Sequence, residues 1–200
     1  MQQIWHTQLA PIVTSLMQTE HCLSTSDHSA VYTAIYNTIM MDPEHGGQYL
    51  HDQLSAFYTA YTLRVYEAGQ SYNAPGAPKD NRSILDYYDT EWDWFSRRVA
   101  VVDRLFNYLN RDWVKVQQYE GRRDIKTVMN VAVTQWKINI FDRLSSRLAA
   151  TFPLPAEESE KTRVDVLRVK FASDNLRPGD LPRMLVSSAV SSDGASCGSS

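Results

Sequence analysis

The chain has 200 residues, of which 43% are hydrophobic and 22% are charged, and its formal net charge is −3. This length suits one large or two small globular domains, and the negative charge argues against attraction of the whole molecule to nucleic acid. Two cysteines, Cys22 and Cys197, form no Cys-x-x-Cys pair and no disulfide framework. We therefore expect a protein of the cytoplasm and nucleus.

Helical periodicity begins at the amino terminus. Residues 1–18 lack the basic start and continuous apolar core of a secretory signal, and no stretch of the chain approaches the ~18 apolar residues of a membrane span. We predict no contact with a membrane. The apolar residues of this first segment lie close to one helical face. Pro11 interrupts it and is expected to kink or open that helix, because its ring clashes with a carbonyl one turn back.

Two further helices are predicted before residue 70. One covers roughly residues 28–41, with Ser26 or Asp27 as its amino-terminal cap, and the run DPEHGG ends it. The next runs from about residue 49 to 69 with a broad apolar stripe. The Pro-, Gly-, Asn- and Ser-rich residues 70–83 then indicate a loop.

The second half of the periodic region contains the longest helical pattern. Residues 84–118 predict either one very long helix or two helices with a bend near residues 95–98, and Gly121 is placed to stop it. A last helix is predicted over residues 125–152, before Pro153 and Pro155. Strand-like alternation is almost absent. The sequence thus predicts an all-α bundle of about five long helices over residues 1–152.

The carboxyl-terminal region differs in composition. Periodicity weakens across residues 153–185, where the sequence indicates part of a helix at most. Residues 186–200 are a Ser- and Gly-rich low-complexity tail, which cannot bury enough apolar surface to offset its ordering entropy. We expect this tail to be disordered.

Catalytic and metal-binding patterns are weak. The five histidines include no pair spaced to put two ligands on one helix face, and the acidic residues of DYYDTEWDWF alternate with aromatics, as on a solvated helix face. The run EGRRDIK places Arg122, Arg123 and Lys126 together, but Glu120 and Asp124 flank them, so nucleic-acid binding is disfavoured. Phosphate-binding and nucleophile motifs are missing. We predict no enzyme and no cofactor.

Aromatic residues beside polar ones offer a different function. Tyr32, Tyr36, Tyr108 and Trp113 are residue types that anchor protein–protein interfaces, although core residues with a polar tip would show the same pattern. The stretches YLNRDWV, EGRRDI and VAVTQWKINIFDRL, with QIW and AVYTAIYN upstream, resemble the amino-terminal region of cullins. The resemblance covers about residues 3–150 and several separately spaced motifs.

This resemblance implies a first cullin repeat, at the end of a ubiquitin-ligase scaffold that serves ubiquitin-dependent protein degradation. It is most similar to the class that uses an F-box-type adaptor in SCF ligases. In the family, the second and fifth helices of this repeat receive the adaptor. The implied contact residues are His28, Ser29, Val31, Tyr32, Ile35, Tyr36, Tyr108, Asn110, Arg111 and Trp113.

Two departures from the family pattern qualify the expectation. His28 and Ser29 stand where close relatives carry a Tyr-Met pair, which bears on adaptor class and affinity. After about residue 152 the family continues into further repeats and a domain that holds the RING subunit, whereas this sequence does not. We therefore expect a truncated cullin that does not bind the RING subunit. The alternative is a non-functional helical fragment or a competitor of full-length cullin.

Overall fold

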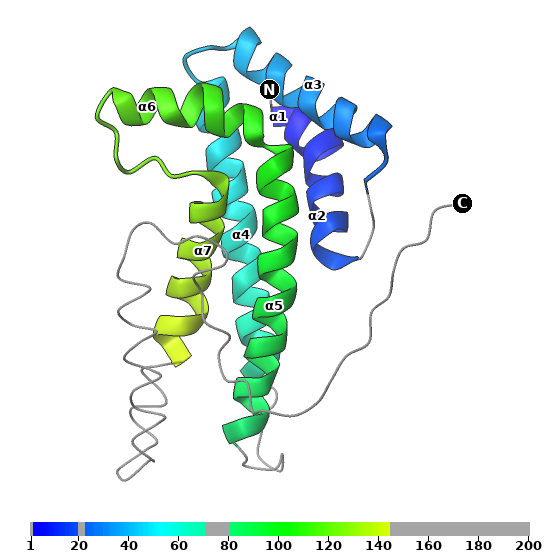
Figure 1. Ribbon diagram of the computed structural model, residues 1–200, viewed down its shortest axis with the longest axis vertical. Coiled ribbons are helices and arrows are strands. Elements are labelled where there is room, and N and C mark those ends of the chain that lie inside the picture. The colour runs from blue at the N-terminus through cyan, green and yellow to red at the C-terminus, as the bar shows by residue number, and fades with distance from the viewer. Residues whose placement is uncertain (1, 20–22, 71–80, 145–200) are drawn as a thin grey trace.

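Figure 1 shows the computed structural model, in which residues 2–19, 23–70 and 81–144 are described. Within these ranges the chain forms helices and no strand, which confirms the predicted all-α class. The elements are α1 (Gln2–Ile4), the π-helix η1 (Trp5–Leu9), α2 (Ala10–Gln18), α3 (Thr25–Met41), α4 (Gly46–Gln70), α5 (Asn81–Leu105), the π-helix η3 (Leu109–Val114), α6 (Lys115–Tyr119), α7 (Val128–Trp136) and the π-helix η4 (Lys137–Phe141). The predictions for residues 145–200 lie outside the described residues.

The helices are arranged around two antiparallel rods. α4 and α5 run side by side in opposite directions, α7 packs against α4 and α2 against α5 (Figure 1). α3 and α6 lie across one end of these rods, at the top of Figure 1. The end of the molecule that carries α3 and α6 is therefore built from segments far apart in the sequence.

The hydrophobic core takes buried residues from η1, α2, α3, α4, α5, η3, α7 and η4, and its aromatic centre lies among α4, α5 and α7. Tyr88, Trp92 and Phe95, three of the aromatics that alternate with the acidic residues of α5, are all buried. Trp136 of α7 is fully buried, with its ring centroid 5.1 Å from that of Trp92 and 4.8 Å from that of Phe95. Each large aromatic contributes a few kcal/mol through burial, so this contact fixes α7 onto the α4–α5 pair.

The acidic stretch of α5 is only partly exposed. Glu91 and Asp93 are half-buried, and burial raises the pKa of Glu91. The side chains of Asp86 and Asp89 lie outside the described part of the chain. The expectation of a solvated helix face therefore needs correction at Glu91 and Asp93, which are partly withdrawn from solvent.

The opening predicted at Pro11 is present. The π-helix η1 ends at Leu9, two residues before the proline, and the N–H of Ala10 donates to the carbonyl of Trp5, five residues back. A wider turn keeps backbone bonds in place where a proline would otherwise clash with a carbonyl. The helix is locally widened rather than broken.

The start of α3 corrects the predicted cap. Ser24, not Ser26 or Asp27, is the amino-terminal cap: its Oγ accepts from the N–H of Asp27 at 3.1 Å. Asp27 reciprocates, since its carboxylate accepts from the N–H of Ser24 at 3.3 Å. This is a capping box, which satisfies two free donors at once. Several adjacent cap-competent side chains made the sequence ambiguous here.

Gly46 and Gly47, which follow α3, do more than end that helix. α3 ends at Met41, as predicted, but α4 begins at Gly46 and not near residue 49. Both Gly46 and Gly47 are buried, and a Cβ on Gly47 would overlap the indole ring of Trp113. Glycine is needed at this position so that α4 can approach the tryptophan closely.

Of the two alternatives predicted for residues 84–118, the one with a bend near residues 95–98 is wrong. α5 is continuous through that segment, and the regular helix is interrupted at Phe106. η3 follows, where the N–H of Lys115 donates to the carbonyl of Asn110, five residues back. Leu109 and Trp113 are four residues apart, a spacing that fits a regular helical turn as well as a π-turn, so the sequence pattern did not reveal it.

Gly121 ends α6, as predicted. Its φ is +95°, in the left-handed region that favours glycine. The N–H of Arg122 donates to the carbonyl of Gln117 and that of Gly121 to the carbonyl of Gln118. These two bonds define a Schellman motif, which satisfies carbonyls at the end of the helix. The last helix then starts at Val128, three residues later than predicted.

A buried hydroxyl leads to a stability prediction. Tyr58 is fully buried and its Oη has no hydrogen-bond partner among the described residues. Burial, with a smaller effect of the Asp103 charge, raises the pKa of Tyr58, so the hydroxyl is neutral at physiological pH. Because an unpaired buried polar group costs about 1–3 kcal/mol, Tyr58→Phe is expected to raise the free energy of unfolding by about 1 kcal/mol. Denaturant titration at neutral pH measures this change.

Tyr88→Phe is the matched control for this prediction. Tyr88 is equally buried, but its hydroxyl donates to the carbonyl of Tyr66 at 3.1 Å. Loss of that bond is expected to lower stability by about 1 kcal/mol. Equal losses of stability in the two variants would contradict the assignment of Tyr58.

Candidate functional site

Three tyrosines from two segments meet at the end of the molecule formed by α3 and α6. Tyr32 and Tyr36 lie four residues apart on α3 and so share one helical face, and they are 44% and 39% exposed. The half-buried Tyr108 precedes η3, and its ring centroid is 5.6 Å from that of Tyr32 and 5.4 Å from that of Tyr36. Both pairs are edge-to-face. We call these three residues the tyrosine cluster.

Desolvation and a nearby charge both affect the phenol group of Tyr108. Partial desolvation raises the pKa of Tyr108, and the nearby Asp112 carboxylate acts in the same direction. The hydroxyl therefore stays protonated at physiological pH and can donate to an acceptor on a partner. A ring that combines an apolar body with a polar tip suits an interface.

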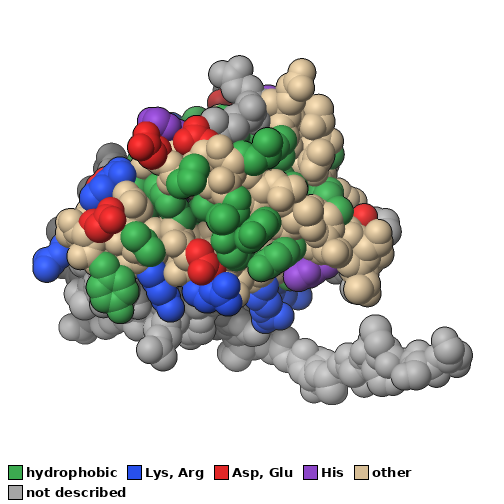
Figure 2. All heavy atoms as spheres, turned by 90° about the horizontal axis from the view of Figure 1, so that it is seen from above, with side chains coloured by type: hydrophobic (Ala, Val, Ile, Leu, Met, Phe, Trp, Pro, Cys, Tyr) green, Lys and Arg blue, Asp and Glu red, His purple; other side chains and the backbone are tan. Residues whose placement is uncertain are grey.

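Hydrophobic side chains gather on the end of the molecule that carries α3 and α6. Figure 2 views this end and shows them across the middle of the face, with most of the charged side chains farther out. The other large exposed hydrophobic residues of α3 and α6 are Met40, Met41, Val116 and Tyr119. An apolar centre with a polar rim is the usual composition of a partner-binding surface.

Three of the ten predicted contact residues are buried instead. Val31 and Ile35 are four residues apart on the core-facing side of α3, about 100° around the helix from Tyr32 and Tyr36. Trp113 is also buried, stacked over Gly47 with its ring 5.7 Å from that of His51. These three side chains pack in the core beneath the exposed face of α3 and η3 and are not accessible at the surface.

The remaining predicted residues divide by exposure. His28 and Ser29 are exposed on the first turns of α3. Arg111 is exposed, and its Nε donates to the Asp112 carboxylate at 2.9 Å. Asn110 is half-buried and turned inward: its Oδ1 accepts from the N–H of Val128 at 3.0 Å. The exposed face therefore contains His28, Ser29, Tyr32, Tyr36, Tyr108 and Arg111.

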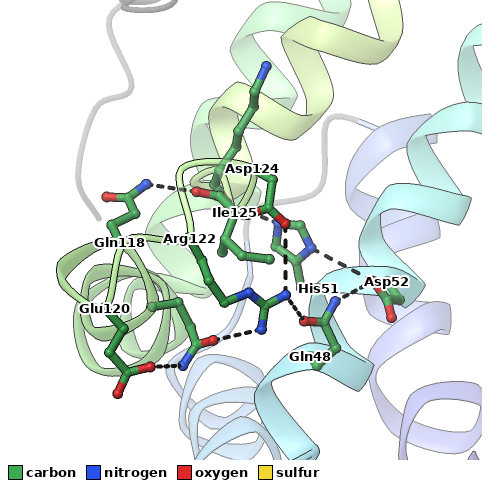
Figure 3. A network of polar contacts seen from close by, with 10 residues as sticks. Gln48, His51, Asp52, Gln118, Glu120, Arg122, Asp124 and Ile125 are labelled. Atoms are coloured by element: carbon green, nitrogen blue, oxygen red, sulfur yellow. Dashed lines mark hydrogen bonds and ion pairs between the residues drawn. The ribbon is translucent and has the colours of Figure 1, made fainter.

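Sequence reasoning missed the polar groups that hold the loop between α6 and α7. Figure 3 shows the side chain of Arg122 pointing toward Gln48 of α4. Its guanidinium donates to the Gln48 amide oxygen at 3.0 Å and to that of Gln117 at 2.8 Å. Nearby, His51 Nε2 lies 3.0 Å from the carbonyl of Lys126. Gln48 lies 74 positions from Arg122 in the sequence, and His51 lies 75 positions from Lys126, so no local motif indicates these two contacts.

Two of the three basic residues in the run EGRRDIK make hydrogen bonds within the chain. Arg122 is engaged by the two glutamines, and Lys126 Nζ donates to the hydroxyl of Thr134 at 3.3 Å. Arg123 is exposed. α6 has no buried residue, whereas Ile125 of the loop is buried in the core, so these polar contacts act together with the packing of Ile125 to hold the loop.

Arg122→Ala tests that role. The substitution is expected to lower the free energy of unfolding by no more than about 1 kcal/mol, because partly exposed polar contacts are weak. Amide exchange in residues 120–127 is expected to become faster, since the loop loses its tie to α4. Arg123→Ala removes an equal charge from the exposed neighbouring position and serves as the control. Identical exchange in the two variants would contradict the role of Arg122.

Metal-binding groups do not converge in the described part of the chain. No group of three or more His, Cys, Asp or Glu residues within residues 2–19, 23–70 and 81–144 is placed to hold a metal ion. Over the same ranges, none of the helices combines the length and apolar character needed to cross a bilayer. The feature that stands out is the tyrosine cluster and its apolar surroundings.

The fold and this face define an all-α helical unit with a surface suited to a protein partner. The chain belongs to the cullin family, because the model of the cullin alpha solenoid domain matches residues 6–164. This match confirms the resemblance found in the sequence.

Three similar curated proteins match part of this chain, and two of them are named cullins. Cullin-1 of Caenorhabditis elegans is 27% identical over 150 residues, which cover 63% of this chain and 18% of that protein. Cullin-1 of Dictyostelium discoideum is 21% identical over 142 residues, covering 71% of this chain and 17% of that protein. Cell division control protein 53 of Saccharomyces cerevisiae is 26% identical over 125 residues, 60% of this chain and 15% of that protein. The chain spans less than a fifth of the length of these relatives.

Proposed function

We propose that this chain is an adaptor-binding cullin repeat, which receives an F-box-type adaptor of SCF ubiquitin ligases on the face of α3 and η3. The tyrosine cluster carries the proposal. Three aromatic rings from two segments meet there with partly exposed faces, and tyrosine is among the residues that most often dominate binding energy. Membership of the cullin family supports an adaptor as the partner.

The proposed contact set is narrower than the ten residues implied by the sequence. Tyr32, Tyr36 and Tyr108 form its centre, and Arg111 forms part of its rim. Val31, Ile35 and Trp113 act from the core by fixing the helices that carry the tyrosines. The chain contributes binding and orientation to the ligase, with no bond-making chemistry of its own.

Titration of the full chain with a purified F-box-type adaptor tests the proposal. Isothermal calorimetry is expected to give a 1:1 complex, with a negative heat-capacity change from burial of the apolar face. Absence of heat and of co-elution with the F-box-type adaptor would refute the proposal.

A further inference from the structure

Asn110 lies at the point where the helical hydrogen-bond pattern changes. Its N–H donates to the carbonyl of Phe106, four residues back, at 3.1 Å. Its own carbonyl accepts from Lys115, five residues on. The extra residue of the π-turn is therefore accommodated between Asn110 and Lys115, directly after the tyrosine that completes the cluster.

The side chain of Asn110 is fixed on both sides. Its Nδ2 donates to Oδ1 of Asp103 at 2.9 Å, and its Oδ1 accepts from the N–H of Val128 at 3.0 Å. The same oxygen of Asp103 accepts from the N–H of Met129, also at 3.0 Å. α5, η3 and α7 are thus joined at one point, in a half-buried environment.

These bonds complete the amino terminus of α7. Thr127 is its cap and accepts from the N–H of Asn130 at 3.3 Å, while Asn110 and Asp103 take the N–H groups of Val128 and Met129. The first three donors of the helix are satisfied, and a carboxylate stands where the helix dipole favours negative charge. Two of the three acceptors, Asp103 and Asn110, belong to α5 and η3. The start of α7 is therefore fixed relative to these two segments.

We infer that Asp103 and Asn110 are positioning residues for the tyrosine cluster, an inference that rests on the proposed function. A π-turn is less stable than regular helix, and its extra residue can move along the chain unless something holds it. Each residue of such a shift turns one part of the helix by about 100° relative to the other. The bonds of Asn110 to Asp103 and Val128 hold the turn in place and thereby keep Tyr108 against Tyr32 and Tyr36.

Asp103→Ala and Asn110→Ala are the test variants. Each is expected to weaken adaptor binding about tenfold, the equivalent of one charge-assisted hydrogen bond. Asp103→Asn retains an oxygen that can accept both bonds, so its affinity is expected to stay within about twofold of wild type. Asn130→Ala, which removes an amide from the same turn of α7 but from none of the bridging bonds, is the control and is expected to bind as wild type.

Two further measurements separate positioning from stability and from the proposed function. Amide exchange at Val128 and Met129 reports loss of the bonds, and nuclear Overhauser contacts of the Tyr108 ring with the rings on α3 report the cluster in the free chain. Asp103→Ala is expected to speed the exchange and weaken the ring contacts, while Asp103→Asn restores the contacts. Unchanged ring contacts with accelerated exchange would overturn the inference, whether or not the adaptor binds. Intact positioning effects in a chain that never binds adaptor would refute the proposed function alone.

Discussion

Replacing Tyr32, Tyr36 and Tyr108 together by alanine is expected to abolish adaptor binding while the chain stays folded. Tyrosines that act as hot spots cost about 2 kcal/mol or more each when truncated, so the combined loss is expected to exceed about 100-fold in Kd even with non-additivity. The two α3 tyrosines are 44% and 39% exposed, so their removal takes little from the core. Calorimetry measures Kd, and thermal unfolding checks the fold.

Two control variants sharpen this experiment. Replacing the three tyrosines with phenylalanine keeps the rings and removes the hydroxyl groups, so most of the affinity is expected to remain if ring burial dominates. Ile138→Ala truncates a residue that is 49% exposed on η4, at the far end of α7 from the cluster, and is expected to leave Kd unchanged. Wild-type affinity in the triple alanine variant would exclude the tyrosine cluster as the adaptor site.

Trp113→Ala is expected to lower the free energy of unfolding by about 3–5 kcal/mol, the usual cost of truncating a buried aromatic residue. The indole is buried and rests on Gly47, beside the ring of His51. Its loss leaves a cavity between η3 and the first turn of α4. Because this loss is a large fraction of the stability of a typical domain, any binding defect of the variant would reflect unfolding. Chemical denaturation followed by circular dichroism measures the change.

Two further variants show whether the stability loss in Trp113→Ala comes from its packing against Gly47. Tyr119→Ala truncates an aromatic that is 91% exposed on α6 and is expected to change stability by less than about 0.5 kcal/mol. Gly47→Ala adds a methyl group against the indole and is expected to cost about 1–3 kcal/mol through overpacking. Full stability in Trp113→Ala would show that the indole does not hold η3 to α4.

Local sequence signals predicted the helices well. The period of apolar residues gave the all-α class and the inward residues of α5, such as Trp92 and Phe95. Gly121 was correctly placed as a stop, because a positive φ after a helix depends on local backbone geometry. The amino-terminal cap predicted for α3 was wrong. Ser24 and Ser26 are chemically equivalent candidates, and only the position of Asp27 selects Ser24.

Exposure of neighbouring residues was harder to predict. Tyr32 and Ile35 both fit an apolar stripe, yet one lies at the surface and the other in the core. Trp113 resembled an interface anchor in sequence, but α4 approaches it closely enough to bury its ring. Whether an amphipathic aromatic residue faces solvent depends on which helix packs over it, and periodicity carries no such information.

The sequence by itself determined the helical class, the family resemblance and the pairing of Tyr32 with Tyr36, because these depend on spacing along one chain segment. Only the tertiary structure decided that Tyr108 joins them and that Asn110 turns inward to α7. It also decided that Arg122 binds Gln48. These contacts join residues 18 to 76 positions apart, and their geometry depends on how α3, α5 and α7 pack in three dimensions.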